Sequence, residues 1–110
     1  MSAFKQWEVY WAFVPFDEGH GGKDRPVVVI SSGKDARAVA LFLSSRRPNN
    51  SYDVEIIDWL KSGLTEKTYT RAARRYALEE LHAHYKMGRL MRLDQIRVAE
   101  VLALYDRLYT

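Results

Sequence analysis

Apolar residues in the first half of the chain fall into short blocks of the kind that form β-strands. Residues 9–16, with the sequence VYWAFVPF, are dense in β-branched and aromatic side chains that fit a pleated sheet. Alternate residues of this block would point to opposite faces, and both sets are apolar, which predicts a strand covered on both sides. Pro15 marks the end of that strand or an edge position.

Three further blocks predict strands that are separated by turns. Residues 17–24 are polar and contain three glycines, so they predict a mobile surface loop, and Arg25 then leads into the strand VVVI at 27–30. A third strand is predicted at 38–43 (AVALFL), followed by a polar turn at 44–50. Residues 52–57 alternate as a half-exposed strand does. Short strands at this spacing predict a small barrel or sandwich.

The second half of the chain has one stretch, residues 68–85, with two possible secondary structures, and it is predicted to end in a helix. Residues 68–85 carry apolar side chains at helical spacing, which favours one amphipathic helix slightly; the alternative is a strand from 68 to about 76 and a short helix ending at Gly88. Asp94 can cap the N-terminus of the last helix. The apolar face of that helix falls within an arc of roughly 120° and consists of Val98, Val101, Leu102, Tyr105, Leu108 and Tyr109.

Length and composition predict one compact domain over residues 1–110. Apolar residues make up 47% and charged residues 28% of the chain, which argues against disorder. No apolar run exceeds six residues, so no membrane span is expected, and charges interrupt the first twenty residues where a secretory signal would lie. The chain has no cysteine, which excludes disulfides, a thiol nucleophile and sulfur-ligated metal and fits a cytoplasmic location.

The distribution of charge favours a polyanionic partner. The net charge is +3 and the pI is about 9.3, a mild excess by itself. Most of it comes from arginine, whose planar fork matches phosphate oxygens better than lysine does. An ordinary solvated surface remains the alternative. The arginines cluster at Arg46 and Arg47, at Arg71, Arg74 and Arg75, and at Arg89 and Arg92.

Two familiar kinds of site are not expected. His82 and His84 could share a ligand only on a strand, and no cluster of carboxylates joins them, so no metal is expected. The glycine-rich residues 19–23 lack the spacing of a nucleotide-binding loop, and they precede a strand where such a loop precedes a helix. No cofactor is expected.

Arginine and serine remain as the candidate chemistry. Arg25 lies at the entrance to a buried strand, and Ser44 and Ser45 follow the next one. If the two strands are neighbours, a guanidinium and a hydroxyl meet at one end of one sheet. In RNA cleavage the substrate's own 2′-OH can be the nucleophile, so a protein that stabilises the charge on the phosphorane and helps to move protons could suffice.

Several blocks of the sequence resemble a known family. Residues 8–11 (EVYW), 15–19 (PFDEG) and 22–31 (GKDRPVVVIS) look like the opening of the PemK/MazF toxins of type II toxin–antitoxin systems. Later blocks that match in order are Leu43-Ser44-Ser45, Gly63-Leu64, Thr68-Tyr69-Thr70-Arg71 and Met87-Gly88-Arg89-Leu90.

The resemblance implies a mainly β (α+β) fold, an SH3-like β-barrel with a short internal helix and a C-terminal α-helix, and it favours the divided interpretation of residues 68–85. It implies a homodimer and an antitoxin partner. It also implies a metal-independent endoribonuclease that cuts single-stranded mRNA at a short motif and arrests growth.

The resemblance also assigns site residues. Arg25 carries over as the catalytic arginine of the Arg-Pro pair, and Ser44 stands where the family has threonine. Some members use an aspartate shortly after the arginine that Arg71 matches, but Ala73 stands at that place here. This leaves the general base open: Glu18 or Asp24 serves as the acid or base, or the site works with Arg25 and Ser44 alone. A further departure is Trp7, where the family usually has glycine before the acidic residue. We expect RNA to be bound by Lys23, Ser45, Arg46, Arg47, Arg71 and Arg74.

Two other functions are compatible with the same barrel. A non-catalytic module would bind RNA or a protein through the arginines and form no products. A toxin that binds DNA gyrase would spare RNA, but it would not need the arginine and hydroxyl around Arg25.

Overall fold

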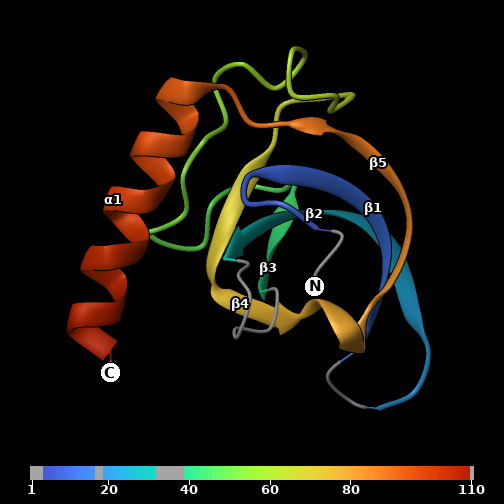
Figure 1. Cartoon of the computed structure of the whole chain (residues 1–110). Helices are drawn as coiled ribbons and strands as arrows, with labels where there is room; N and C mark the ends of the chain where they lie inside the picture. The colour runs from blue at the N-terminus through green and yellow to red at the C-terminus, as the bar shows by residue number, and fades with distance from the viewer. Residues whose placement is uncertain (1–3, 17–18, 32–38, 110) are drawn as a thin grey trace.

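The computed structural model describes residues 4–16, 19–31 and 39–109, in which five antiparallel strands form one sheet and a long helix ends the chain. The sheet order is β4-β3-β2-β1-β5. The sheet curls into an open, SH3-like barrel, with the helix standing beside it (Figure 1). The elements are β1 (Glu8–Pro15), β2 (Gly22–Ser31), β3 (Val39–Ser44), β4 (Tyr69–Ala77), the 3₁₀ turn η1 (Leu78–Glu80), β5 (His82–Arg89) and α1 (Arg92–Tyr109).

The sheet is covered on both faces, as the apolar pattern of the first strand predicts. Val9, Val28 and Leu41 pack on one face against Val98 of α1. The opposite face is made by a second cluster that includes Val27, Val29 and Phe42 of the central strands together with Leu78 and Leu81 around η1. Because side chains alternate between the faces, strands that are apolar throughout can serve both clusters.

The strand β2 begins earlier than predicted. The loop expected over 17–24 is wrong at its C-terminal end, because Gly22, Lys23 and Asp24 pair with β1, where Phe13 lies opposite Asp24. Residues 17 and 18 lie outside the described residues. The pairing places the candidate site residues at 23–25 on a strand, which holds side chains more precisely than a free loop does.

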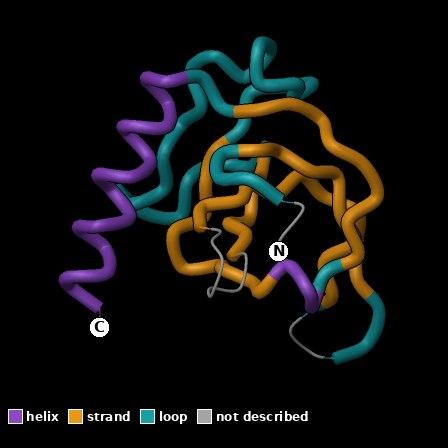
Figure 2. Tube along the Cα trace, viewed as in Figure 1, coloured by secondary structure: helices purple, strands orange, loops and turns teal. Residues whose placement is uncertain are grey.

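The strand predicted at 52–57 is not present as a regular strand. Only one bridge, between Glu55 and Tyr69, joins this segment to β4. The backbone is nevertheless bonded there, since the Thr70 amide donates to the Val54 carbonyl and the Ile56 amide to the Thr68 carbonyl. Figure 2 shows the segment as part of the long connection that lies near the helix. Its side chains alternate between buried and exposed because one side of the segment packs against the core, and not because the segment is a strand of the sheet.

The amphipathic helix favoured by the spacing of residues 68–85 is wrong. This stretch forms β4, the turn η1 and the first half of β5, and the two strands pair with β3 and β1 respectively. The divided alternative is correct for its strand, but its helical part is only the three-residue turn η1. Pairing with strands distant in sequence overrides a local helical periodicity.

The C-terminal helix is confirmed, but the predicted cap is wrong. Asp94 lies inside the first turn and is buried, and its carboxylate accepts hydrogen bonds from the amides of Ile57 (3.0 Å) and Asp58 (2.9 Å). It therefore fastens the 57–58 segment to the helix. The predicted apolar face is buried at Val98 and Leu102, while the last turn of the helix is exposed. Among the described helices, none is both long and apolar enough to cross a membrane.

Gly63 and Gly88 lie where two backbone segments approach closely, and both lie in blocks that carry the family resemblance. Gly63 has a φ of +91°, and a Cβ added to it would lie 2.1 Å from the Met87 carbonyl oxygen. A Cβ on Gly88 would lie 2.2 Å from the Ser62 carbonyl oxygen. The 57–64 segment and β5 can approach this closely only because neither residue has a side chain.

Trp7 adopts the backbone conformation that a glycine favours. Its φ is +74°, its side chain is buried, and its carbonyl accepts a hydrogen bond from the Leu90 amide. This geometry gives a physical reason for the family's usual glycine before the acidic residue. Here the strain, about 1 kcal/mol or more for a non-glycine residue, accompanies the packing of an indole ring in the core.

Glu8 joins the start of β1 to β5 through an ion pair in which the carboxylate is nearly buried and the Lys86 side chain is half exposed. The side chain is 8% exposed and lies 2.7 Å from Lys86 Nζ. Burial alone would raise the pKa of its carboxyl. Hydrogen bonds from Lys86, from the Lys5 amide and from the Tyr10 hydroxyl outweigh burial, and the net effect lowers that pKa below its ordinary value of 4.5.

Replacing Glu8 by glutamine should remove one source of stability that depends on pH. A carboxyl with a lowered folded pKa stabilises the fold above its ordinary pKa of 4.5, and this stabilisation is lost as the pH falls through the folded value. Glu8→Gln should therefore cost about 1–3 kcal/mol at neutral pH, and its difference from the native chain should shrink in acid. Urea unfolding across this range measures both. The control Glu55→Gln removes an exposed ion pair to Lys67 and should change little; a constant deficit of Glu8→Gln at every pH would contradict the assignment.

Candidate active site

The structure brings Arg25 and Ser44 to the same end of neighbouring strands. β2 and β3 are antiparallel, with Val27 opposite Phe42, and continuing this register by two residues places Arg25 opposite Ser44. Both residues line a pocket of about 250 Å³. The strand adjacency on which the sequence argument depended is thus observed.

Phe42 provides a platform for two guanidinium groups. Arg25 Cζ lies 5.1 Å and Arg74 Cζ 5.4 Å from the centroid of its ring. A cation–π interaction of this kind contributes about 0.5–1 kcal/mol at an exposed site. It also restricts the arginine side chain to fewer rotamers. The side chain of Arg25 is therefore held in place over the sheet before any ligand arrives.

Three pockets meet at Arg25. The second, of about 270 Å³, is also lined by Ser44, Arg46 and Arg74. The third, of about 140 Å³, is lined by Arg25 and Arg74 together with residues at the end of β1. Three pockets that share one guanidinium in their lining suit an extended, negatively charged ligand.

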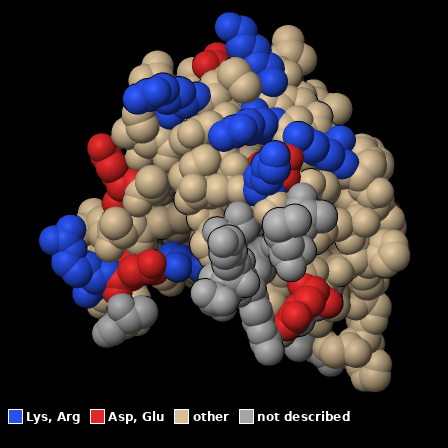
Figure 3. All heavy atoms as spheres, viewed as in Figure 1, with Lys and Arg blue, Asp and Glu red and all other residues tan. Residues whose placement is uncertain are grey.

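Exposed polar side chains surround these hollows. Lys23 and Ser45 line the first pocket, and Arg46, Arg47 and Arg74 are exposed. On the face seen in Figure 3, several groups of basic side chains lie over the upper half, and others lie beside acidic side chains at the lower left.

The Ser44 hydroxyl is oriented by its own turn. The Arg46 amide donates a hydrogen bond of 3.2 Å to Ser44 Oγ, and the residue is only 6% exposed although it lines two of the pockets. Because the oxygen accepts from the protein, the hydroxyl can donate its hydrogen to a ligand oxygen.

Of the two predicted acid–base groups, one is described. Asp24 lines the first pocket and its Oδ1 lies 2.8 Å from His84 Nε2, a contact between β2 and β5 across β1. Both side chains are partly exposed, at 47% and 35%. Glu18 lies outside the described residues. Ala73, at the place where some family members have aspartate, is exposed on β4.

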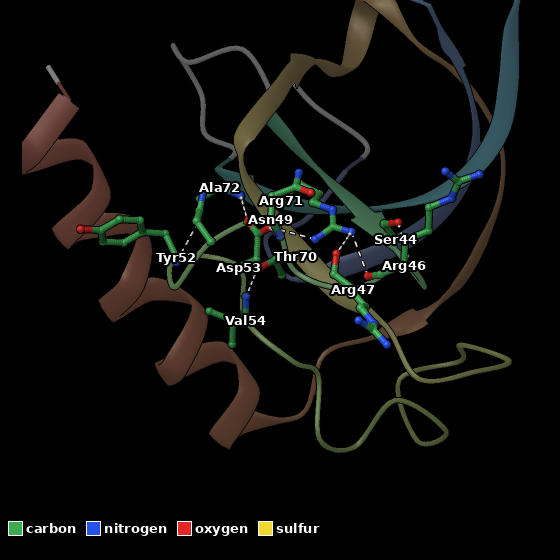
Figure 4. A network of polar contacts seen from close by, with 11 residues as sticks. Ser44, Arg46, Arg47, Asn49, Tyr52, Asp53, Val54, Thr70, Arg71 and Ala72 are labelled. Carbon is green, nitrogen blue, oxygen red and sulfur yellow. Dashed lines mark hydrogen bonds and ion pairs between the residues drawn. The ribbon is translucent and has the colours of Figure 1, made fainter.

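Arg71 is nearly buried, and its guanidinium is bonded within the protein. Its side chain is 6% exposed and forms an ion pair of 2.8 Å with Asp53, and its other terminal nitrogen donates to the carbonyls of Arg46 and Arg47. Figure 4 shows the guanidinium at the centre of this network. Although it borders the second pocket, its hydrogen bonds are directed into the protein.

Phe42 and Asp53 are functional candidates that sequence reasoning missed. Phe42 lies two residues before Ser44 on the same strand face, so the alternation of β3 could have indicated it. Asp53 had no such signal, because its partner is 18 residues away. As for metals, the described ranges 4–16, 19–31 and 39–109 contain no group of three or more ligating side chains suited to an ion.

Comparison with known proteins settles the family. A family model described as PemK-like, MazF-like toxin of type II toxin–antitoxin systems matches residues 5–105. The chain belongs to this family. A similar solved structure is the Mycobacterium tuberculosis toxin MazF-mt6, with a TM-score of 0.65 and 14% identity over 90% of this chain and 96% of that one. This likeness supports the fold. No curated protein matches the sequence.

Membership of the PemK/MazF family confirms the resemblance found in the sequence. A toxin of a type II system has an antitoxin partner, so the family also implies a second protein that binds this chain.

Proposed function

We propose that this PemK/MazF-family toxin is an endoribonuclease that cleaves single-stranded RNA, mRNA in particular, at a short motif and thereby stops translation. The observation that carries the proposal is that Arg25 and Ser44, on neighbouring strands, line one pocket flanked by exposed basic side chains. A cytoplasmic location follows from this target.

In the proposed reaction the substrate supplies its own nucleophile. The 2′-oxygen attacks the adjacent phosphorus as its proton leaves to a base, for which Asp24 or Glu18 is the candidate. Negative charge builds on the phosphorane oxygens, where the Arg25 guanidinium and the Ser44 hydroxyl stabilise it. The bond to the 5′-oxygen breaks, that oxygen takes a proton, and the products are a 2′,3′-cyclic phosphate and a 5′-hydroxyl.

Binding of the RNA is assigned to the surrounding basic groups. Lys23, Arg46, Arg47 and Arg74 are exposed along the pockets and would contact backbone phosphates, and Ser45 would donate a hydrogen bond. Because such contacts release counterions, binding should weaken steeply with salt.

We also propose that the toxin is a homodimer. The last two turns of α1 expose Leu104, Leu108 and Tyr109, by 43%, 57% and 63% respectively. A chain of this size gains stability when it buries such surface in a second copy.

Incubation of purified protein with single-stranded RNA in EDTA tests the function. We expect discrete fragments whose upstream ends carry a 2′,3′-cyclic phosphate. Binding with no products would favour the non-catalytic module, and inhibition of DNA supercoiling with intact RNA would favour a gyrase-directed toxin.

A further inference from the structure

The ion pair between Asp53 and Arg71 is the most deeply buried one among the described residues. The side chains are 3% and 6% exposed, and Arg71 Nη1 lies 2.8 Å from Asp53 Oδ2. Two charges removed from water recover their desolvation only through good geometry and further hydrogen bonds.

Both partners hold the turn that follows β3. Arg71 Nη2 donates to the carbonyl oxygens of Arg46 (2.8 Å) and Arg47 (2.7 Å). Asp53 Oδ2 accepts from the Asn49 amide at 2.7 Å, and Oδ1 accepts from the Ala72 amide at 3.3 Å. The pair thus fixes the turn on both sides of Pro48 and ties it to β4.

The same turn carries groups that the proposed function needs. The Arg46 amide donates to Ser44 Oγ, and the side chains of Arg46 and Arg47 are exposed. In Figure 4 these two side chains extend away from the buried guanidinium. The backbone of the turn faces inward to Arg71 while its side chains face solvent.

We propose that Asp53 and Arg71 are positioning residues: the buried pair fixes the turn at 45–49 so that Arg46 and Arg47 face the RNA and Ser44 Oγ keeps its orientation. This inference rests on the proposed function. Arg71 then acts through the turn. It is not itself a phosphate ligand, although the sequence suggested that role.

Asp53→Asn separates this proposal from simple electrostatics. Removing a negative charge close to a basic surface should tighten the binding of a polyanion if only charge matters. If the pair positions the turn, the same substitution should weaken binding, for two reasons. A neutral amide oxygen holds the Arg71 guanidinium less strongly than a carboxylate does, and the new NH2 group cannot accept from the Ala72 amide while the oxygen accepts from Arg71 and the Asn49 amide.

The first measurement uses a ligand that cannot be cleaved. Fluorescence anisotropy with a mixed-sequence single-stranded DNA of about 12 nucleotides, within the usual range of binding-site sizes, gives affinity without turnover. We expect Asp53→Asn to weaken binding about tenfold. Unchanged or tighter binding would overturn the proposal.

The second measurement requires no nucleic acid. Hydrogen exchange should show faster exchange of the Arg46 and Asn49 amides in Asp53→Asn than in the native protein, at a temperature where both are folded by tryptophan fluorescence. Unaltered protection of both amides would also overturn the proposal. If the native chain neither binds the probe nor cleaves RNA, the proposed function fails, while this measurement still decides whether the pair orders the turn.

A control removes the same charge from an arginine–aspartate pair that does not touch the turn and is more exposed, with side chains 28% and 45% accessible. Asp106→Asn breaks the ion pair between α1 and Arg75 of β4, which spans 2.6 Å. It should lower stability and leave the affinity for DNA and the exchange of the Arg46 amide unchanged. An equal loss of affinity in this variant would show that reduced stability, not position, is the cause.

Arg71→Lys in two backgrounds distinguishes positioning from direct contact. Lysine keeps the charge but loses the planar fork that reaches the carboxylate and two carbonyls at once. In the native background we expect weaker binding. In a chain that already carries Arg46→Ala and Arg47→Ala, the substitution should add no further loss, whereas an additive loss would mean that Arg71 contacts phosphate itself.

Discussion

Alanine in place of Arg25 should reduce RNA cleavage by about 100- to 1000-fold, the effect of removing one preorganised donor to a developing anion. The guanidinium is held over Phe42 at the junction of three pockets. It is only half-buried, so its loss should cost the fold little. Single-turnover cleavage in EDTA, together with thermal unfolding, measures both effects.

The control for Arg25→Ala is Arg74→Ala. Arg74 lies at a similar distance from the same ring but does not line the pocket that contains Asp24 and Ser45. It should weaken RNA binding and leave the rate at saturating RNA nearly unchanged. Cleavage by Arg25→Ala at the native rate would refute the site assignment, and so would equal rate losses in the two variants.

The sequence predicts the parts of this protein that depend on local pattern. Blocks of β-branched, aromatic and other apolar residues predict β1, β2 and β3, and the apolar periodicity after Asp94 predicts α1. The Arg-Pro pair at the entrance to β2 indicates the candidate site, and the adjacency of β2 and β3 brings Arg25 and Ser44 to one pocket. The sequence near each of these features is enough to predict it, without knowledge of residues distant in the chain.

What the sequence could not predict depends on partners distant in the chain. Residues 68–85 have helical spacing, yet β3 and β1 draw them into the sheet. Asp94 resembles a cap, but the amides of residues 57 and 58 lie within its reach only in the fold. Arg71 resembles a surface arginine until Asp53 is placed beside it.

The same contrast applies to the glycines at 63 and 88. In the sequence they are short elements of a family resemblance. In the fold each lies against the backbone of the other's neighbour, so that the connection after residue 57 closes on β5. This contact helps to shape the first pocket, which is lined by Leu64 and Met87.

Gly63→Ala should therefore be among the most destabilising single substitutions in the chain. The residue has a φ of +91°, which costs an L-residue about 1–2 kcal/mol. The new Cβ would also lie 2.1 Å from the Met87 carbonyl oxygen and 2.6 Å from its carbon, so β5 must move, and overpacking of this kind costs about 1–3 kcal/mol or more. We expect a total of about 3 kcal/mol or more, a large part of the 5–15 kcal/mol that stabilises a typical domain.

Gly19→Ala separates strain from collision. Gly19 also has a left-handed φ, +83°, but a Cβ there would meet no atom of the described residues within 4 Å, so only the backbone cost of about 1–2 kcal/mol applies. Gly88→Ala, whose Cβ would meet the Ser62 carbonyl oxygen at 2.2 Å, should resemble Gly63→Ala although its φ is not left-handed. Urea unfolding of the three variants ranks them. Equal losses in Gly19→Ala and Gly63→Ala would mean that backbone conformation alone explains the glycine at 63, and that the close approach of the two segments is not what fixes this end of the barrel.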